Sequence, residues 1–382
     1  KYSCFTMAEH RQASYKQTFS GKGAAKRKQV AVNLRKERRL AEISKRRKEL
    51  DTTDEGGMVQ TFNAEDMHKA LAKISSGSEQ DRGLALQSLR AFLSCDQGFE
   101  SLDTLINSGV IKVLLGVIVE AESVVAEHQF AALCCLTNIA TGSYEQTKSV
   151  LEAAPALLAL LSSSSSLLQE QAAWCFGNLA GEDIELRHTL VQNGVGPPLV
   201  QLLSHSSASL VAVSLWAISN CLKGPGTSLA VFDQAGLFDQ LCKLLMSSPD
   251  EKVLSEALWV LTRLCNFREC HSGPTPPQHP TQNAQPLQHP SSTYIAMLIQ
   301  RQLLARVAVA IAHPSHGVVL PAVRLAGALT SDPVHASTCS NLLSQASSTV
   351  PALLHCATSQ VHRGIKKEAC WVLANITGAD DV

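Results

Sequence analysis

The sequence has few aromatic residues and no long apolar run. Phe, Trp and Tyr make up 5% of its 382 residues, and no stretch approaches the roughly 18 consecutive apolar residues that indicate a membrane-spanning helix. Its twelve cysteines follow no regular spacing, and no segment has the pattern of a secretory signal peptide. These absences argue against a disulfide framework and a membrane span, and we expect a reducing compartment, the cytoplasm and nucleus.

Patterns for catalysis are also missing. His128, Cys134 and Cys135 could suggest a thiol nucleophile, but the two cysteines stand at positions that favour packing within a helix. The sequence contains no acid–base constellation and no phosphate-binding glycine loop. We therefore expect no catalytic residue and no cofactor, so the chain is not predicted to be an enzyme.

One short helical phrase occurs in four copies. The copies lie at residues 136–140, 174–180, 216–220 and 371–376. In three of them a Trp and an Asn stand four residues apart, which places ring and amide on one face of a helix. Trp216 follows Trp174 by 42 residues and Trp259 follows Trp216 by 43, a period typical of armadillo repeats. Core packing of the Trp residues is the alternative, although a repeated Asn would be unfavourable in a core.

A second register supports the same period. Gly109, Gly194 and Gly236 each follow a similar apolar phrase, and the last two are 42 residues apart. Each glycine is predicted to form the turn between the last helix of one repeat and the second helix of the next, where φ is positive or the backbones approach closely. Two independent patterns therefore agree on the repeat length.

These registers predict an all-α fold, an armadillo-repeat right-handed superhelical solenoid with a basic N-terminal arm. We expect the arm over residues 1–55, extended then helical and partly disordered, followed by repeats one to five over 56–266. A Pro-, His- and Gln-rich disordered insertion is predicted over 267–292 and repeats six and seven over 293–382. Cys270, His271, His279 and His289 in the insertion lack any paired metal-ligand spacing, so no metal site is expected.

Charge is divided unevenly between the arm and the body. Residues 1–50 hold 15 of the 33 Lys and Arg and 4 of the 33 Asp and Glu, so they carry +11 and the remainder carries −11. This asymmetry indicates that the arm folds onto the body or binds an acidic partner. A nucleic-acid-binding tail is the alternative, but no aromatic residues interleave its charges, and we expect no direct nucleic-acid partner.

The arm resembles the importin-β-binding arm of importin-α, the adaptor of nuclear protein import. The resemblance rests on the stretches 19–23, 32–36 and 45–47, with Ser20 where the family usually has Lys. It implies an importin-β-type receptor as a partner and an autoinhibitory contact of the last cluster with the chain's own groove. The residues implied in these roles are Arg11, Lys22, Lys26, Arg27, Lys28, Arg35, Lys36, Arg38, Arg39, Lys45, Arg46 and Arg47.

The resemblance continues over about 11–266 and 294–378 and implies a concave groove that binds Lys/Arg-rich nuclear localisation signals. Indole faces would accept the cationic stems, amides would hold the peptide backbone, and carboxylates would select positive charge. The residues implied in cargo binding are Asn138, Gly142, Thr147, Trp174, Asn178, Glu182, Asp183, Trp216, Asn220, Glu256, Trp259, Arg324, Glu368, Trp371 and Asn375.

The sequence departs from the family pattern at several groove positions. Cys134 stands where the first Trp is usual, Arg263 replaces the polar partner of Trp259, and Ala328 replaces the Asn after Arg324. The sequence also ends just after its last repeat, which indicates an apparent C-terminal truncation. The acidic patch through which the export receptor binds is then missing, so that partner is in doubt.

The sequence thus predicts a nuclear import adaptor that binds basic cargo signals and links them to an importin-β carrier. The alternative is an armadillo scaffold, or a degenerate importin-α-like protein without classical cargo binding. Its expected localisation is the cytoplasm and nucleus, with no membrane span.

Overall fold

The computed structural model describes residues 64–94, 101–120, 126–224, 229–266, 290–359 and 363–378. The chain divides into two units, Lys1–Thr61 and Phe62–Val382, and every described residue belongs to the second. The predicted basic arm over 1–55, with all its implied receptor-binding residues, lies outside the described residues. So does most of the predicted insertion, 267–289.

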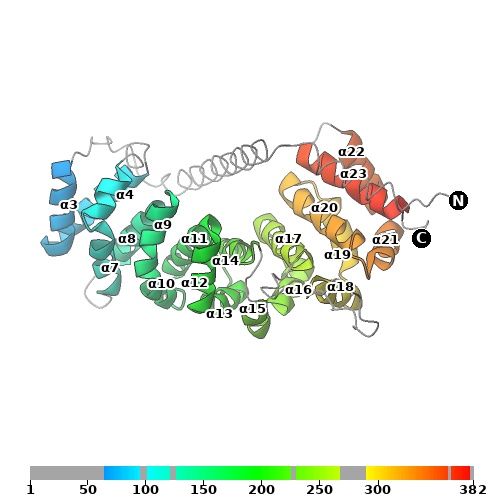
Figure 1. Cartoon of the computed structure of the whole chain (residues 1–382), viewed down its shortest axis with the longest axis horizontal. Helices are drawn as coiled ribbons and strands as arrows, with labels where there is room; N and C mark the ends of the chain where they lie inside the picture. The colour runs from blue at the N-terminus through cyan, green and yellow to red at the C-terminus, as the bar shows by residue number, and fades with distance from the viewer. Residues whose placement is uncertain are drawn as a thin grey trace, which may run out of the picture. The chain divides into compact units, whose positions relative to one another are not determined.

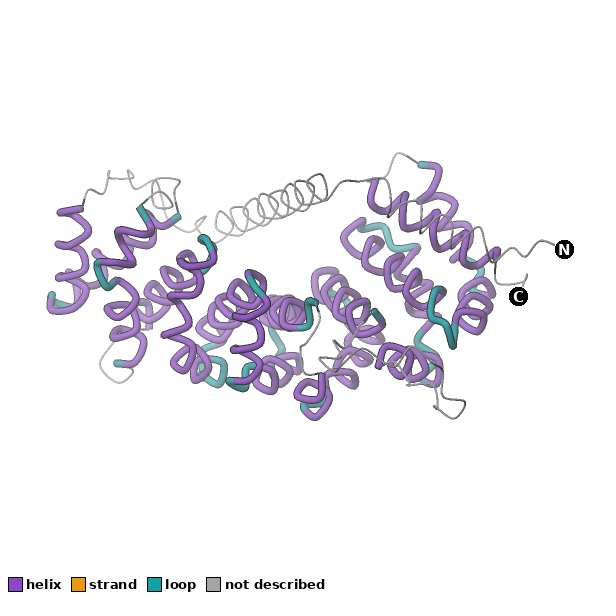
Figure 2. Tube along the Cα trace, viewed as in Figure 1, coloured by secondary structure: helices purple, strands orange, loops and turns teal. Residues whose placement is uncertain are grey.

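The described residues form helices and no strand, and short turns connect the helices (Figure 2). A short run of helices, closed by a longer one, recurs along the chain. The first four groups are α3 (Ala64–Ser76) and α4 (Glu79–Leu93); α6 (Leu102–Asn107), α7 (Val110–Val119) and α8 (Ala126–Ile139); α9 (Tyr144–Ser149), η1 (Val150–Ala153), α10 (Ala154–Leu160) and α11 (Ser166–Glu182); α12 (Ile184–Gln192), α13 (Gly196–Gln201), η2 (Leu202–Ser204) and α14 (Ala208–Cys221).

Three further groups complete the series: α15 (Leu229–Gln234), α16 (Leu237–Ser247) and α17 (Glu251–Cys265); α18 (Pro290–Gln300), α19 (Leu304–Ile311) and α20 (His316–Thr330); α21 (Ala336–Gln345), α22 (Thr349–Thr358) and α23 (Arg363–Gly378). We call the last helix of each group its third helix. The third helices α4, α8, α11, α14, α17, α20 and α23 pack side by side in chain order (Figure 1).

One continuous core runs through the stacked helices. Buried apolar side chains from Met67 to Val372 form a single cluster, to which each third helix contributes fully buried residues such as Leu133, Phe176 and Leu258. No single group could cover its own apolar face, so each is stabilised by its neighbours. The prediction of an all-α repeat fold is confirmed for the described residues.

The predicted turn glycines adopt the left-handed conformation. The φ angles of Gly109, Gly194 and Gly236 are 83°, 85° and 80°. A residue with a Cβ adopts such values only with steric strain. Gly109 and Gly236 directly precede α7 and α16. The predicted positive φ is confirmed, but each glycine stands between the first and second helices of one group rather than after the last helix of the preceding group. The missing Cβ explains why glycine recurs before the second helix.

Short polar residues cap four of the third helices. Ser78, Ser165, Ser207 and Asp250 precede α4, α11, α14 and α17, and the side chain of each accepts a hydrogen bond from a backbone N–H in the first turn. Such caps satisfy donors that have no partner within the helix. The polar turns between second and third helices therefore fix where each third helix starts.

The helix α18 begins at Pro290 rather than at the predicted residue 293. Ser292 is buried, and its hydroxyl donates to Oδ1 of Asp332 at 2.8 Å. This tertiary contact stabilises the start of the helix. A Pro- and His-rich composition gives no indication of it. Beyond it, α20 packs against α17, so the third helices remain neighbours across the low-complexity segment.

No single helix of the described residues is long and apolar enough to cross a membrane. The pair Ser291–Gln300 and Leu304–Ile311 reaches the required length and apolar content only when joined across its 93° bend.

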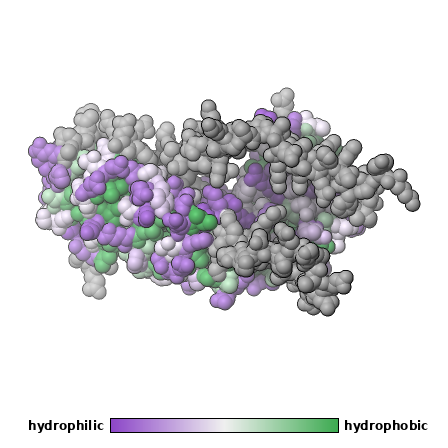
Figure 3. Space-filling view, viewed as in Figure 1, coloured by the Kyte–Doolittle hydropathy of each residue, from purple (hydrophilic) through white to green (hydrophobic). Residues whose placement is uncertain are grey.

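The surface of the described residues carries scattered apolar side chains. Figure 3 shows small hydrophobic areas among hydrophilic ones on the face in view. Large exposed apolar residues such as Leu84, Val119, Met246 and Leu354 come from different groups of helices. Isolated apolar residues of this kind are normal on a protein surface.

Candidate functional site

The repeated Trp and Asn residues contact the preceding third helix as a pair. The indole of Trp216 lies against Gly177 of α11 so closely that a Cβ at Gly177 would overlap the ring. One turn later, Asn220 Nδ2 donates to the carbonyl oxygen of Gly177 at 2.9 Å. Trp216 and Asn220 therefore contact the same glycine from one side of α14. We call this pair of contacts, an indole and an amide on one residue or turn of the preceding third helix, the clasp.

The same clasp recurs between the last two third helices. Trp371 of α23 lies against Gly327 of α20, where a Cβ would again overlap the indole. Asn375 Nδ2 donates to Oγ1 of Thr330 at 3.1 Å. Gly327 stands three residues after Arg324, as Gly177 stands three residues after Trp174. We call the side of the third helices that carries these pairs the ladder face.

The other two amides also bridge to the preceding repeat. Asn178 Nδ2 donates to the carbonyl oxygen of Thr137 at 3.1 Å, and Asn138 Nδ2 donates to Ser94 Oγ at 3.3 Å. Each bond uses one of the two N–H groups of an amide. The sequence analysis missed this role in joining repeats, although the small or β-branched residue before each of three asparagines, at 137, 177 and 219, was a signal for it.

The four indoles differ in exposure. Trp174 is only 7% exposed, Trp216 and Trp259 are partly buried, and Trp371 is 44% exposed. Trp174 is a member of the continuous core cluster, whereas Trp216 packs against that cluster. Trp174 and Trp216 therefore also fill space between neighbouring helices, whereas Trp371 remains open to solvent.

The ring of Trp259 already has a cation over it. Arg324 Cζ lies 5.1 Å from the centroid of this ring, and Arg324 Nε lies 3.3 Å from Glu368 Oε1. A guanidinium over an indole is attracted by the negative face of the ring. These three predicted cargo residues are thus brought together, but they bind one another, one from each of α17, α20 and α23.

Arg263 takes the place that asparagine has on α8, α11, α14 and α23. Its Nε donates to Oγ of Ser219 on α14 at 3.1 Å, so it bridges to the preceding repeat as the amides do. Burial lowers the pKa of Arg263, and the positive charges of Arg187 and Arg324 lower it further, whereas Glu256 raises it. The ladder face therefore gains positive charge at α17.

Comparison with known proteins supports the same architecture. A model of the armadillo/beta-catenin-like repeat matches residues 183–223 and 228–266, and a HEAT-like repeat model matches 126–179. A designed armadillo repeat protein in complex with the peptide (KR)4 superimposes with a TM-score of 0.54 at 23% identity, over 70% of this chain and 99% of that one.

Curated relatives are importin-α subunits. Importin subunit alpha-9 of Arabidopsis thaliana is 28% identical over 398 residues, and importin subunit alpha-1b of Oryza sativa subsp. japonica is 29% identical over 306. The matches cover 97% and 78% of this chain. The chain is similar to importin-α subunits over most of its length. It spans 70% of the first relative's length and 51% of the second's.

The similarity to importin-α subunits agrees with the absence of catalytic patterns in the sequence. Importin-α and armadillo-repeat proteins are non-enzymatic adaptors or scaffolds, which agrees with the prediction that the chain is not an enzyme. Cys134 and Cys135 are both buried, and burial strongly raises the pKa of the Cys135 thiol. A thiol in this state is not a nucleophile at neutral pH.

Four of the residues that the resemblance implies in cargo binding are Gly142, Thr147, Glu182 and Asp183, which we call the predicted pocket. The first two have structural partners. Thr147 is fully buried, and its hydroxyl donates to the carbonyl oxygens of Ala140 at 3.3 Å and Gly142 at 3.4 Å. At Gly142, a Cβ would overlap the side chain of Gln146, which caps the start of α9. Gly142 and Thr147 therefore build the turn between α8 and α9, and the Thr147 hydroxyl is not presented at the surface.

The two acidic residues of the same predicted pocket lie at the next turn. Glu182 ends α11, and Asp183 caps α12 by accepting from the backbone N–H of Glu185 at 2.9 Å. Tyr144 in α9 donates to Glu185 Oε2 at 2.9 Å, which connects this turn to the Gly142 turn. The structure thus brings the predicted pocket residues into adjacent, bonded turns of the importin-α-like body.

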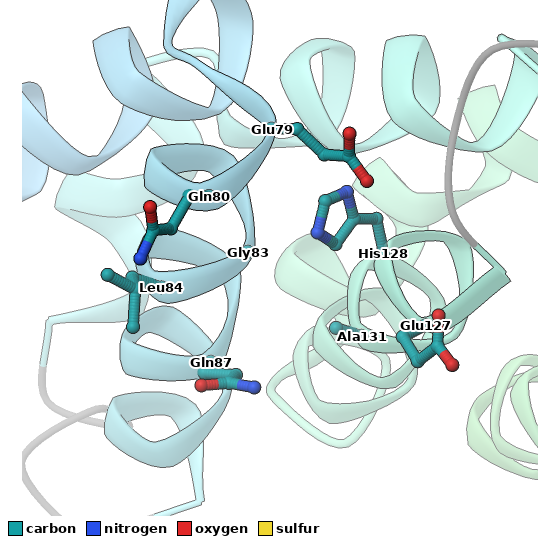
Figure 4. A pocket seen from close by; sticks show the side chains of 8 residues that line it. All are labelled: Glu79, Gln80, Gly83, Leu84, Gln87, Glu127, His128 and Ala131. Atoms are coloured by element: carbon teal, nitrogen blue, oxygen red, sulfur yellow. The ribbon is translucent and has the colours of Figure 1, made fainter.

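An open pocket that the sequence analysis missed lies between α4 and α8 (Figure 4). Its volume is about 480 Å³. Figure 4 shows the His128 ring directed from α8 toward Gly83 of α4, with Glu79 above it and Glu127 on the near side of α8. The remaining lining residues are Gln80, Leu84, Gln87 and Ala131. Its two carboxylates give this gap a negative character, but no unusual contact indicates a ligand.

The four residues weighed as metal ligands, Cys270, His271, His279 and His289, lie outside the described residues. Within the parts of the chain that the structure describes, no three His, Cys, Asp or Glu side chains gather in a way that could hold a metal ion.

Proposed function

We propose that this chain is a nuclear import adaptor that binds Lys/Arg-rich nuclear localisation signals along the ladder face and links them to an importin-β-type carrier. The central site in this proposal is formed by Trp174 and Trp216 with Asn178 and Asn220. The basic arm over 1–55 would bind the carrier. Similarity to importin-α subunits supports this role, and a designed protein of the same fold is in complex with a (KR)4 peptide.

The clasp on Gly177 is the observation on which the proposal depends. It fixes an indole and an amide on one side of α14, one turn apart, with Trp216 only partly buried. An indole offers its face to the aliphatic stem and charge of Lys or Arg. The amide of Asn220 keeps one N–H and its carbonyl oxygen for a peptide backbone.

Peptide titration tests the proposal. A fluorescent peptide with five consecutive Lys or Arg residues should bind the full chain, and Trp216→Ala should weaken binding about tenfold, the scale of a lost cation–π contact. Met246→Ala, on the exposed surface of α16, is the matched control and should bind as the unmodified chain does. Thermal unfolding of each variant separates lost binding from lost folding.

Absence of binding by the folded, unmodified chain would refute cargo recognition and favour the second candidate, an armadillo scaffold without classical cargo. Two observations favour that candidate. Cys134 is buried where an indole would serve as a wall, and Arg324 covers Trp259 from the chain itself. Retention of an importin-β-type receptor on the immobilised chain, lost on removal of residues 1–55, tests the carrier contact independently.

A further inference from the structure

Arg263 differs in its hydrogen-bonding groups from the asparagines at the equivalent positions of α8, α11, α14 and α23. Asparagine offers both donors and an acceptor to a bound peptide, whereas a guanidinium offers only donors. Arg263 stands four residues after Trp259, as Asn220 stands four after Trp216, and its Nε reaches Ser219 as Asn220 reaches Gly177. A ligand at this position must therefore supply oxygen atoms.

The far end of the guanidinium remains available. The bond to Ser219 Oγ is the only hydrogen bond of Arg263 among the described residues, and no carboxylate there forms an ion pair with it. Its side chain is partly exposed, so the two Nη groups keep four N–H donors in a planar fork. That fork matches the two oxygens of a carboxylate or phosphate.

Neighbouring charges favour an anion here. Arg187 and Arg324 both add positive charge at Arg263, and Glu256 opposes them. Arg187 is held in place by donating from Nε to the carbonyl oxygen of Ala180 at 2.9 Å. Glu368 neutralises Arg324 in part, at 3.3 Å. A Lys or Arg of a bound peptide would be repelled at this point, unlike at the indoles of α11 and α14.

We propose that Arg263 is a specificity-determining residue that binds an anionic side chain, a carboxylate or a phosphate monoester, of a peptide whose basic cluster lies at Trp174 and Trp216. The inference rests on the proposed function. Neighbouring third helices lie about 10 Å apart, and an extended peptide rises about 3.3 Å per residue. The anion should therefore stand about three to six residues from the basic cluster, on one side of it.

The test compares peptides that differ at a single position. Each carries the same five-residue basic cluster, with Gln, Glu or phosphoserine placed three to six residues before or after it. On one side of the cluster, Glu or phosphoserine should bind the full chain roughly tenfold more tightly than Gln, the scale of a charge-assisted hydrogen bond. The stronger of the two identifies carboxylate or phosphate as the preferred source.

Variants of Arg263 complete the test. Arg263→Gln should reduce the preference to nearly onefold, and Arg263→Glu should reverse it in favour of a peptide with Lys at that position. A preference that persists in the folded Arg263→Gln chain would overturn the inference, as would equal binding of Gln and Glu peptides by the unmodified chain. If no peptide binds at all, the proposed function itself fails, which is a distinct result. The peptide comparison on the unmodified chain holds even if a variant does not fold.

Discussion

The indole of Trp216 rests on Gly177 of the preceding third helix, and Asn220 donates to the carbonyl oxygen of that same glycine. The indole depends on the missing Cβ of Gly177, and the amide depends on its backbone oxygen. The same indole and amide form the proposed peptide site. If the proposed function holds, stability and peptide recognition depend on the same two residues, one helical turn apart.

Gly177→Ala should lower the free energy of unfolding by about 1–3 kcal/mol, because the new Cβ forces Trp216 to move. This sign is opposite to the helix propensity of alanine, which favours the substitution by up to about 1 kcal/mol. Gly116→Ala in α7 is the matched control, since nothing lies within 4 Å of a Cβ there. Denaturant titration should show the two variants moving in opposite directions, and parallel shifts would contradict the clasp.

Arg324→Gln should uncover the ring of Trp259. The direct stability loss should stay below about 1 kcal/mol, the value of an exposed cation–π contact. A basic peptide long enough to reach Trp259 should bind more tightly, as measured by anisotropy, because the ring face becomes available. Glu368→Gln leaves the guanidinium in place and serves as the control. Glu368→Gln removes a negative charge and leaves the ring covered, so it should not tighten binding of a basic peptide. Tighter binding by Glu368→Gln as well as by Arg324→Gln would contradict the explanation by an occupied ring.

Asp332 should make the sixth and seventh repeats sensitive to acid. Its carboxylate accepts from Ser292 Oγ at 2.8 Å and from the His335 backbone at 3.0 Å, and Nδ1 of His335 lies 3.0 Å away. Burial raises the pKa of Asp332, but the hydrogen bonds from Ser292, His335 and Val334 together bring it below its ordinary value. A carboxyl group with a lowered pKa stabilises the fold above its unfolded value, and that stability is lost as pH falls through the folded value.

The expected result is that Asp332→Asn destabilises the chain at neutral pH by roughly 1–3 kcal/mol, as for other buried hydrogen-bonded groups. The difference from the unmodified chain should shrink as pH falls below about 4, the ordinary value of Asp, and vanish only below the lowered pKa of the folded chain. Thermal unfolding followed from pH 7 to pH 3 measures it. A difference that stays constant over this range would exclude the ionised carboxylate as its source.

Cysteine reactivity should follow burial. Cys370 is exposed, whereas Cys175 and Cys221 are buried and burial raises the pKa of each to about 12. Because the thiolate is the reactive form, an alkylating reagent at pH 8 should modify Cys370 before Cys175 and Cys221, as quantified by peptide mass spectrometry. In urea the rates should converge. Early modification of Cys175 in the folded chain would show that α11 opens more readily than its contacts imply.

Removal of residues 1–50 should tighten binding of a basic peptide. The +11 charge of this segment and the −11 charge of the remainder favour competition between the segment and cargo for one surface. The affinity gain should shrink at high salt, because mobile ions screen exposed charges. Unchanged affinity at low salt would show that Lys45, Arg46 and Arg47 do not compete with the peptide for the ladder face.

Several features of the fold were predictable from spacing alone. The 42-residue period set the third helices, and the left-handed turns at Gly109, Gly194 and Gly236 follow from the missing Cβ. The start of α18 at Pro290 was not predictable, because its anchor is Asp332, some 40 residues away. Composition reports local preference, whereas this contact is long-range.

Some features of the candidate site were likewise predictable from the sequence, and others were not. The one-turn spacing of Trp216 and Asn220 was sufficient to place ring and amide on one face. The sequence could not show that Thr147 is fully buried or that Arg324 lies over Trp259. Both depend on which side chains of neighbouring repeats fill the space between helices, and a repeat period does not specify that.

By itself, the sequence determined the repeat, its period and the residues that recur in it, because helical geometry converts a fixed spacing into a fixed face. Only the tertiary structure decided which of those residues are partnered within the chain. Glu368 and Arg324 bind each other, whereas the Nη groups of Arg263 remain available. The reason is physical: partners come from the next repeat, about 40 residues on, and are chosen by packing rather than by position in the sequence.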